Sequence, residues 1–179
     1  YGNNYQYPEP ISPYGVSKLA AETYCRLFHE LHRLHTVVFR FSSVYGFGRA
    51  PTSINLIIAK ALRNETIQIT GNGSQTRDFT YVSDIAEALV MSTEKKFPSG
   101  VYDTGTGVAT SINELVHLLE QLLNKQISTQ YIPSNNADPR RNELNVSKAA
   151  SYGFKAQVSL KEGLEKLIRK LNDEKNMSH

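Results

Sequence analysis

Tyr14 and Lys18 are the residues of this sequence whose types and spacing most directly point to chemistry. They lie four residues apart, and a predicted helix that begins at Ser12 would place both side chains on one face, about one turn from each other. An ammonium group beside a phenol stabilises the phenolate, so such a pair can take up and release a proton near neutral pH. The spacing alone also fits an ordinary pair on a protein surface.

Three other sets of residues have less support for a chemical role. His29, His32 and His35 recur at a spacing of three, but no carboxylate or cysteine completes a metal-binding set with them. Cys25 is the only cysteine, which excludes an intramolecular disulfide, and we expect it to be a packed thiol in the core. Asp84 follows a predicted strand, and we expect its side chain to cap the next helix. We therefore predict no metal site.

Four segments, taken in order, share the pattern of one protein family. The residues around Tyr14 read SPYGVSK (12–18), and the other segments are FSSVYG (41–46), GNGSQTRDFTYVSD (71–84) and YDTG (102–105). With these motifs in this order, the chain resembles the extended short-chain dehydrogenases/reductases that act as NAD-dependent nucleotide-sugar epimerases and dehydratases. The resemblance is to the C-terminal half of enzymes similar to UDP-glucose 4-epimerase.

The resemblance implies an NAD cofactor and a catalytic role for Tyr14. Tyr14 would exchange a proton with a sugar hydroxyl while a hydride moves between that carbon and nicotinamide, and Lys18 would bind the nicotinamide ribose. The family's phosphate loop, G-x-x-G-x-x-G, does not occur in these residues, since Gly71 and Gly105 each begin a pattern of only two glycines. Because the sequence begins at Tyr1 without a methionine, we expect a truncated chain. Most of its NAD site would precede this residue, and the isolated chain would be inactive.

The resemblance also implies residues that bind the substrate. Arg77 would contact the diphosphate, since a guanidinium fork matches paired phosphate oxygens, although a surface salt bridge is the alternative. Ser43 stands where the family usually has an asparagine that binds the sugar phosphate. An arginine common in uridine diphosphate binders is replaced here by Asn135. Arg140 or Arg141, ahead of a predicted helix start at 147–149, would substitute for it or would be solvated.

Helices and strands alternate along the chain and would position these residues. Apolar residues at spacings of three and four predict a helix over 12–34, with one face packed against the core. The runs 36–41 and 101–104 predict buried strands. The fold class is therefore α/β, the C-terminal part of a Rossmann-type parallel sheet plus a smaller α/β substrate-binding part. We assign residues 1–45 and 79–110 to the Rossmann-type part, and residues 46–78 and 111–179 to the nucleotide-sugar-binding part.

The C-terminal third contains two helix-start signals of the same kind. Ser-x-x-Glu patterns at 111–114 and 159–162 precede apolar residues at helical spacing and predict capping boxes. The polar tail from Asn172 lacks this spacing, and we expect it to fray.

The composition limits the class of protein and its partners. A chain of 179 residues suits one compact domain, and its net charge of +3 is too small for a dedicated nucleic-acid surface. No apolar run approaches the ~20 residues that span a bilayer. We expect a cytoplasmic protein without membrane or nucleic-acid partners. The resemblance implies a homodimer through the helix of Tyr14, whose apolar face would otherwise be exposed.

The first function that the resemblance implies is 4-epimerisation of a UDP-hexose or UDP-N-acetylhexosamine by the full-length enzyme. Ser43 and Asn135 also permit 4,6-dehydration, or epimerisation at another carbon. An inactive fragment or a partner-binding module is the alternative from a different class.

Overall fold

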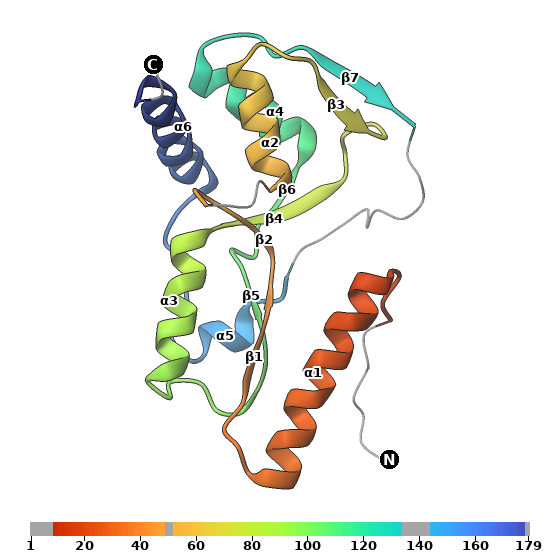
Figure 1. Cartoon of the computed structure of the whole chain (residues 1–179), viewed down its shortest axis with the longest axis vertical. Helices are drawn as coiled ribbons and strands as arrows, with labels where there is room; N and C mark the ends of the chain where they lie inside the picture. Colours follow the sequence, from red (N-terminus) through yellow and green to blue (C-terminus); the bar gives the residue numbers. More distant parts are fainter. Residues whose placement is uncertain (1–8, 49–51, 134–143, 178–179) are drawn as a thin grey trace.

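The computed structural model describes residues 9–48, 52–133 and 144–177, with side chains described as far as residue 173. Helices and strands form a mixed α/β fold, which confirms the predicted class (Figure 1). Within these ranges, no helix is long and apolar enough to cross a membrane. The helices are α1 (Pro13–His32), α2 (Ser53–Leu62), α3 (Val82–Thr93), α4 (Ile112–Leu123), α5 (Ser147–Ala150) and α6 (Leu160–Met177). The strands are β1 (Val37–Phe41), β2 (Ser43–Tyr45), β3 (Ile67–Thr70), β4 (Thr76–Tyr81), β5 (Gly100–Thr104), β6 (Ala109–Ser111) and β7 (Thr129–Ile132).

The strands of the described residues form three small sheets. β1 pairs with β5 and β3 pairs with β7, both in parallel. In the third sheet β4 is central, parallel to β2 and antiparallel to β6. Parallel neighbours need long crossover connections, which the intervening helices provide. Only Ser42 separates β1 from β2, so the chain passes directly from the first sheet into the third.

The β1–β5 pair has different helices on its two sides. α3 and α5 lie on one side and α1 on the other (Figure 1). The side of α3 and α5 contains a closely packed core, in which the rings of Phe97 and Tyr102 lie 4.9 Å apart in an edge-to-face arrangement. This core consists of Ala88, Met91, Phe97, Tyr102, Ala149 and Phe154.

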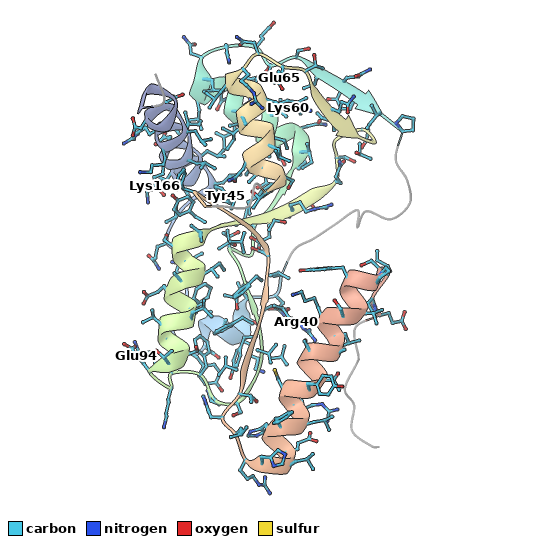
Figure 2. The ribbon with its side chains drawn as sticks, in the orientation of Figure 1. Arg40, Tyr45, Lys60, Glu65, Glu94 and Lys166 are labelled. Atoms are coloured by element: carbon cyan, nitrogen blue, oxygen red, sulfur yellow. The ribbon has the colours of Figure 1, made fainter. Side chains whose placement is uncertain are left out.

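A second core joins α2, α4 and α6 to β2 and β4. Tyr45 lies at the base of α6 (Figure 2), and its hydroxyl donates to the Leu160 carbonyl oxygen at 3.2 Å. A Cβ at Gly163 would collide with that hydroxyl, so glycine allows α6 to approach β2 this closely. The buried residues are Tyr45, Ile54, Ile58, Phe79, Leu115, Leu119, Leu164, Leu167 and Ile168.

Helix α1 turns its apolar face away from the sheet. None of its residues is buried, and Tyr24, Phe28 and Leu31 remain 65%, 49% and 72% exposed. The prediction that this stripe packs against the core is therefore wrong, because the side of α1 that meets the sheet is polar. Cys25, predicted as a core thiol, is only half-buried.

The helix starts confirm the predicted caps. Ser12 accepts a hydrogen bond at 3.1 Å from the backbone N–H three residues further on, at the start of α1. Ser111 and Glu114 form a reciprocal capping box at α4, and Ser159 and Glu162 form another at α6. The hydrogen bonds from Ser111 hold the pKa of Glu114 below its ordinary value.

Two other predictions about helix ends are wrong. α6 continues to Met177 instead of fraying from Asn172, because its preceding turns are packed into the second core. Asp84 lies in the first turn of α3, but the N-cap position is Tyr81 and no side chain caps this helix. The Asp84 carboxylate instead accepts a hydrogen bond from the Val158 backbone N–H at 3.1 Å.

Candidate functional site

Tyr14 and Lys18 lie together in the first two turns of α1, as their spacing predicts. The Lys18 Nζ atom is 5.3 Å from the centroid of the Tyr14 ring. Pro13 at the first helical turn and the Ser12 cap fix where the helix begins, and so fix the direction of these side chains. The Ser17 hydroxyl also donates to the Tyr14 carbonyl oxygen at 2.8 Å. Because Tyr14 is 71% exposed, its phenol is accessible to a second molecule.

The fold places this pair at the carboxyl edge of the β1–β5 sheet. α1 runs antiparallel to β1, so the N-terminal end of the helix lies beside the C-terminal end of the strand (Figure 1). In open parallel sheets, ligands bind outside the carboxyl ends of the strands. The exposed phenol and ammonium groups therefore lie at the edge where this class of fold binds its ligands.

Ser43 and Arg77 lie on neighbouring strands of the third sheet. Ser43 opens β2, immediately after β1 ends, and pairs in register with Phe79 of β4. Side chains alternate along a strand, so Phe79 and Arg77 share one face of β4, and Ser43 shares that face too. The Arg77 guanidinium donates from Nη1 to the Thr76 carbonyl oxygen at 2.8 Å. The structure thus brings these two predicted residues onto one face of one sheet.

A cavity of about 330 Å³ opens next to the strand that contains Arg77. Its walls are β4 and β6 on one side and the segment between α5 and α6 on the other. Thr110, which pairs with Arg77, contributes to the lining. This volume lies at the lower end of the range for small-molecule sites. The remaining lining residues are Phe79, Thr106, Val108 and residues 156–160.

Arg140 and Arg141, the other predicted substrate-binding residues, lie outside the described residues. The helix start predicted after them is confirmed as α5. Lys148 of α5 donates from Nζ to the Val101 carbonyl oxygen at 2.8 Å, and lies 4.4 Å from the centroid of the Tyr102 ring. These contacts hold α5 against β5.

Asp78 is a buried acidic residue whose hydrogen-bond partners could not be predicted from the sequence. Its Oδ1 atom accepts hydrogen bonds from the backbone N–H and hydroxyl of Thr106, at 3.0 and 2.6 Å. Its Oδ2 atom accepts from the Gly107 N–H at 2.9 Å. Gly105 passes so close that a Cβ there would lie 2.6 Å from Oδ2. Asp78 therefore fastens the connection between β5 and β6 to β4, next to Arg77.

Tyr45 and Asp84 are two further buried polar side chains whose hydrogen-bond partners could not be predicted from the sequence. Both are buried, at 1% and 5% exposure. Burial raises the pKa of Tyr45 above its ordinary value, with smaller contributions from Tyr81 and Asp84. Through their bonds to Leu160 and Val158, the two side chains anchor the start of α6 to β2 and α3. Their role is to hold elements together, because both face packed protein.

His29 of α1 and His35, which lies between α1 and β1, both bond to backbone carbonyl oxygens. His29 donates from Nδ1 to the Leu34 carbonyl oxygen at 2.7 Å, and His35 donates from Nε2 to the Phe97 carbonyl oxygen at 2.9 Å. In the part of the chain with described side chains, no group of three or more His, Cys, Asp or Glu residues could hold a metal ion.

Comparison with known proteins shows one consistent relationship. Residues 2–105 match the NAD dependent epimerase/dehydratase family. A putative UDP-glucose 4-epimerase of Methanocaldococcus jannaschii is 35% identical over 163 residues, which cover 89% of this chain and 53% of the relative. The dTDP-D-glucose 4,6-dehydratase of Homo sapiens is 30% identical over 168 residues, covering 89% of this chain and 48% of the relative. The crystal structure of UDP-glucose 4-epimerase from Thermotoga maritima with UDP-glucose has a TM-score of 0.89 and 32% identity, over 93% of this chain and 55% of that chain.

The matched range contains Tyr14, Lys18, Ser43 and Arg77. The chain spans about half the length of the curated relatives that it matches. Sequence, fold and the order of the motifs agree, and this chain belongs to the NAD-dependent epimerase/dehydratase family.

Proposed function

We propose that the full-length enzyme containing this chain is an NAD-dependent nucleotide-sugar 4-epimerase that acts on a UDP-hexose or UDP-N-acetylhexosamine. The main support is the exposed Tyr14–Lys18 pair at the carboxyl edge of the parallel strands, in a chain of this family. The similar proteins of M. jannaschii and T. maritima are a putative and a structurally characterised UDP-glucose 4-epimerase.

The exposed donors on α1 fit the ribose and nicotinamide side of an NAD cofactor. A phenol and an ammonium group one turn apart can donate to ribose hydroxyls. When bound, NAD supplies a reversible hydride acceptor for the sugar carbon. Tyr14 takes the proton from the hydroxyl on that carbon and later returns it. Lys18 donates to the ribose hydroxyls and so orients the cofactor beside Tyr14.

The substrate lies between the two predicted parts of the chain in this proposal. Arg77 binds the diphosphate, Ser43 donates to a phosphate or sugar oxygen, and Arg140 or Arg141 adds a second positive charge. The cavity beside β4 offers room for one ring of the nucleotide-sugar. Residues 46–78 and 111–179 then form the nucleotide-sugar-binding part, and residues 1–45 and 79–110 form the cofactor part.

Product analysis of the full-length enzyme tests this function. With NAD and UDP-glucose, we expect formation of the C4 epimer, resolved by NMR or chromatography of the products. UDP-N-acetylglucosamine, supplied in parallel, separates hexose from N-acetylhexosamine specificity. If neither compound is converted, the epimerase proposal fails, and the inactive or partner-binding alternative gains support.

A 4,6-dehydratase is the second candidate function, because the human dTDP-D-glucose 4,6-dehydratase is 30% identical to this chain. A dehydratase would eliminate water and give a 4-keto-6-deoxy sugar instead of an epimer. The same product analysis with dTDP-glucose distinguishes the two reactions by mass.

We also propose that the full-length enzyme works in the cytoplasm, where Cys25 stays reduced, and that it is a homodimer that buries the apolar face of α1. Leu31 is 72% exposed on this face, and an exposed apolar patch commonly marks an interface. Leu31→Glu should convert the dimer into a monomer at micromolar concentration, as measured by sedimentation. Leu89→Glu is the matched control, because Leu89 of α3 is 48% exposed outside this face. A Leu31→Glu protein that remains dimeric would place the interface elsewhere.

A further inference from the structure

Helix α1 meets the β1–β5 sheet through polar and charged side chains. Glu22 faces the sheet, whereas Tyr24, Phe28 and Leu31 of the helix remain exposed. A cavity of about 210 Å³ lies between helix and sheet, with Arg26 and His29 on one wall and Val38 and Gly100 on the other. Close packing normally fixes how a helix is rotated about its axis. Here that packing is incomplete.

One bidentate ion pair ties the middle of α1 to the sheet. Arg40 of β1 donates from Nε to Glu22 Oε2 at 2.8 Å and from Nη2 to Glu22 Oε1 at 2.6 Å. Figure 2 shows Arg40 between β1 and α1. The Glu22 side chain is only 16% exposed. Two parallel bonds between planar groups define an orientation, which a single contact does not.

The Arg40 guanidinium also has a charged partner on the neighbouring strand, β5. Arg40 pairs in register with Asp103 of β5, and its Nη1 lies 4.0 Å from Asp103 Oδ1. Burial raises the pKa of Asp103, while the charge of Arg40 opposes this shift. Arg40 therefore links two carboxylates, one on the helix and one on the sheet.

Tyr14, Lys18 and Glu22 follow one another at intervals of four and form one row along α1. We infer that Glu22 is a positioning residue, whose two bonds to Arg40 fix the rotation of α1 on the sheet. Rotation of the helix would move the whole row, so this contact also fixes where the phenol and ammonium groups point. The inference rests on the proposed function, in which Tyr14 transfers the proton.

The expected effect of losing this contact is large. A helix with its side chains is about 10–12 Å across, so a rotation of about 20° moves a side-chain end by about 2 Å. Misplacement of reacting groups by about 1 Å can cost roughly 100-fold in rate. We therefore expect kcat to fall about 10-fold to 100-fold when the pair is broken.

Glu22→Gln in the full-length enzyme tests the inference. The kcat for nucleotide-sugar should fall by this factor, while its KM should stay within about twofold, because Glu22 does not touch the substrate. Arg40→Lys keeps the charge but loses the fork, so its kcat should lie between those of Glu22→Gln and wild type. Should Glu22→Gln not fold, Arg40→Lys provides the comparison. Glu30→Gln is the matched control, since it breaks an exposed 2.8 Å pair with Arg26 on the same helix, and its kcat should match wild type.

A double variant separates positioning from general destabilisation. If Glu22 acts mainly through Tyr14, Glu22→Gln should cause a smaller fractional loss of kcat in the Tyr14→Phe background than in wild type. The same fractional loss of kcat in both backgrounds would overturn the inference but leave the proposed mechanism standing. So would wild-type kcat for Glu22→Gln and Arg40→Lys while Tyr14→Phe is impaired. Wild-type kcat for Tyr14→Phe would instead overturn the proposed mechanism, and the inference with it.

Discussion

The Tyr14→Phe variant of the full-length enzyme is expected to have a turnover number at least about 100-fold below that of wild type, with little change in melting temperature. The substitution keeps the aromatic ring and the start of α1, but removes the hydroxyl that exchanges a proton with the sugar. General acid–base groups typically contribute roughly 100-fold to 10,000-fold to rate. Steady-state kinetics of epimerisation and thermal unfolding measure the two quantities separately.

Two companion variants define what the Tyr14→Phe result means. Lys18→Met should also lower turnover and should weaken NAD binding, because Lys18 donates to the ribose and so orients the cofactor beside Tyr14 in the proposed site. Arg77→Ala should mainly raise the KM for nucleotide-sugar, since it removes contacts to the substrate diphosphate. If Tyr14→Phe turns over substrate at near wild-type rate, another group transfers the proton.

Asp78→Ala is expected to cause the largest loss of stability among the substitutions considered. It removes the acceptor of three hydrogen bonds from Thr106 and Gly107. Each buried donor left without a partner costs about 1–3 kcal/mol, and because these donors are only half-buried we expect about 2–4 kcal/mol in total. Urea unfolding of the full-length enzyme should show this loss in the transition that includes β4. It would be a large part of the total of about 5–15 kcal/mol typical of a domain.

Two controls test whether the buried carboxylate is the cause. Asp78→Asn keeps the shape of the side chain and one acceptor oxygen. It should therefore lower the free energy of unfolding by less than Asp78→Ala does. Glu65→Gln removes an exposed carboxylate paired with Arg63 at 2.9 Å, and should change the free energy of unfolding by less than about 1 kcal/mol. Equal stability of Asp78→Ala and wild type would mean that the 105–107 turn is held by other contacts.

Much of the local structure could be predicted from sequence because its causes are local. Ser12, Ser111 and Ser159 cap their helices with partners three residues away, and the sequence shows both members of each pair. The one-turn separation of Tyr14 and Lys18 is likewise a property of the helix itself.

The sequence predictions that proved wrong concern the partners against which a helix or a side chain packs in the folded chain. The apolar row on α1 shows where Tyr24 and Leu31 lie on the helix, but the described chain supplies no core on that side. Asp84 has the type and place of a cap, yet its partner Val158 is distant in sequence and is brought there only by tertiary folding. The same holds for Asp78, whose partners lie 28 and 29 residues further along the chain.

The pairing of β1 with β5 also affects how the protein is made. Val37 pairs with Gly100 and Phe41 with Thr104, so the ribosome releases β1 well before β5 has been synthesised. Pairings between distant segments lose loop-closure entropy before they gain contacts, which slows folding. Until β5 is available, the backbone groups on that edge of β1 lack their native strand partner and can pair with other nascent chains. We therefore expect this topology to fold more slowly than a helical protein of the same length.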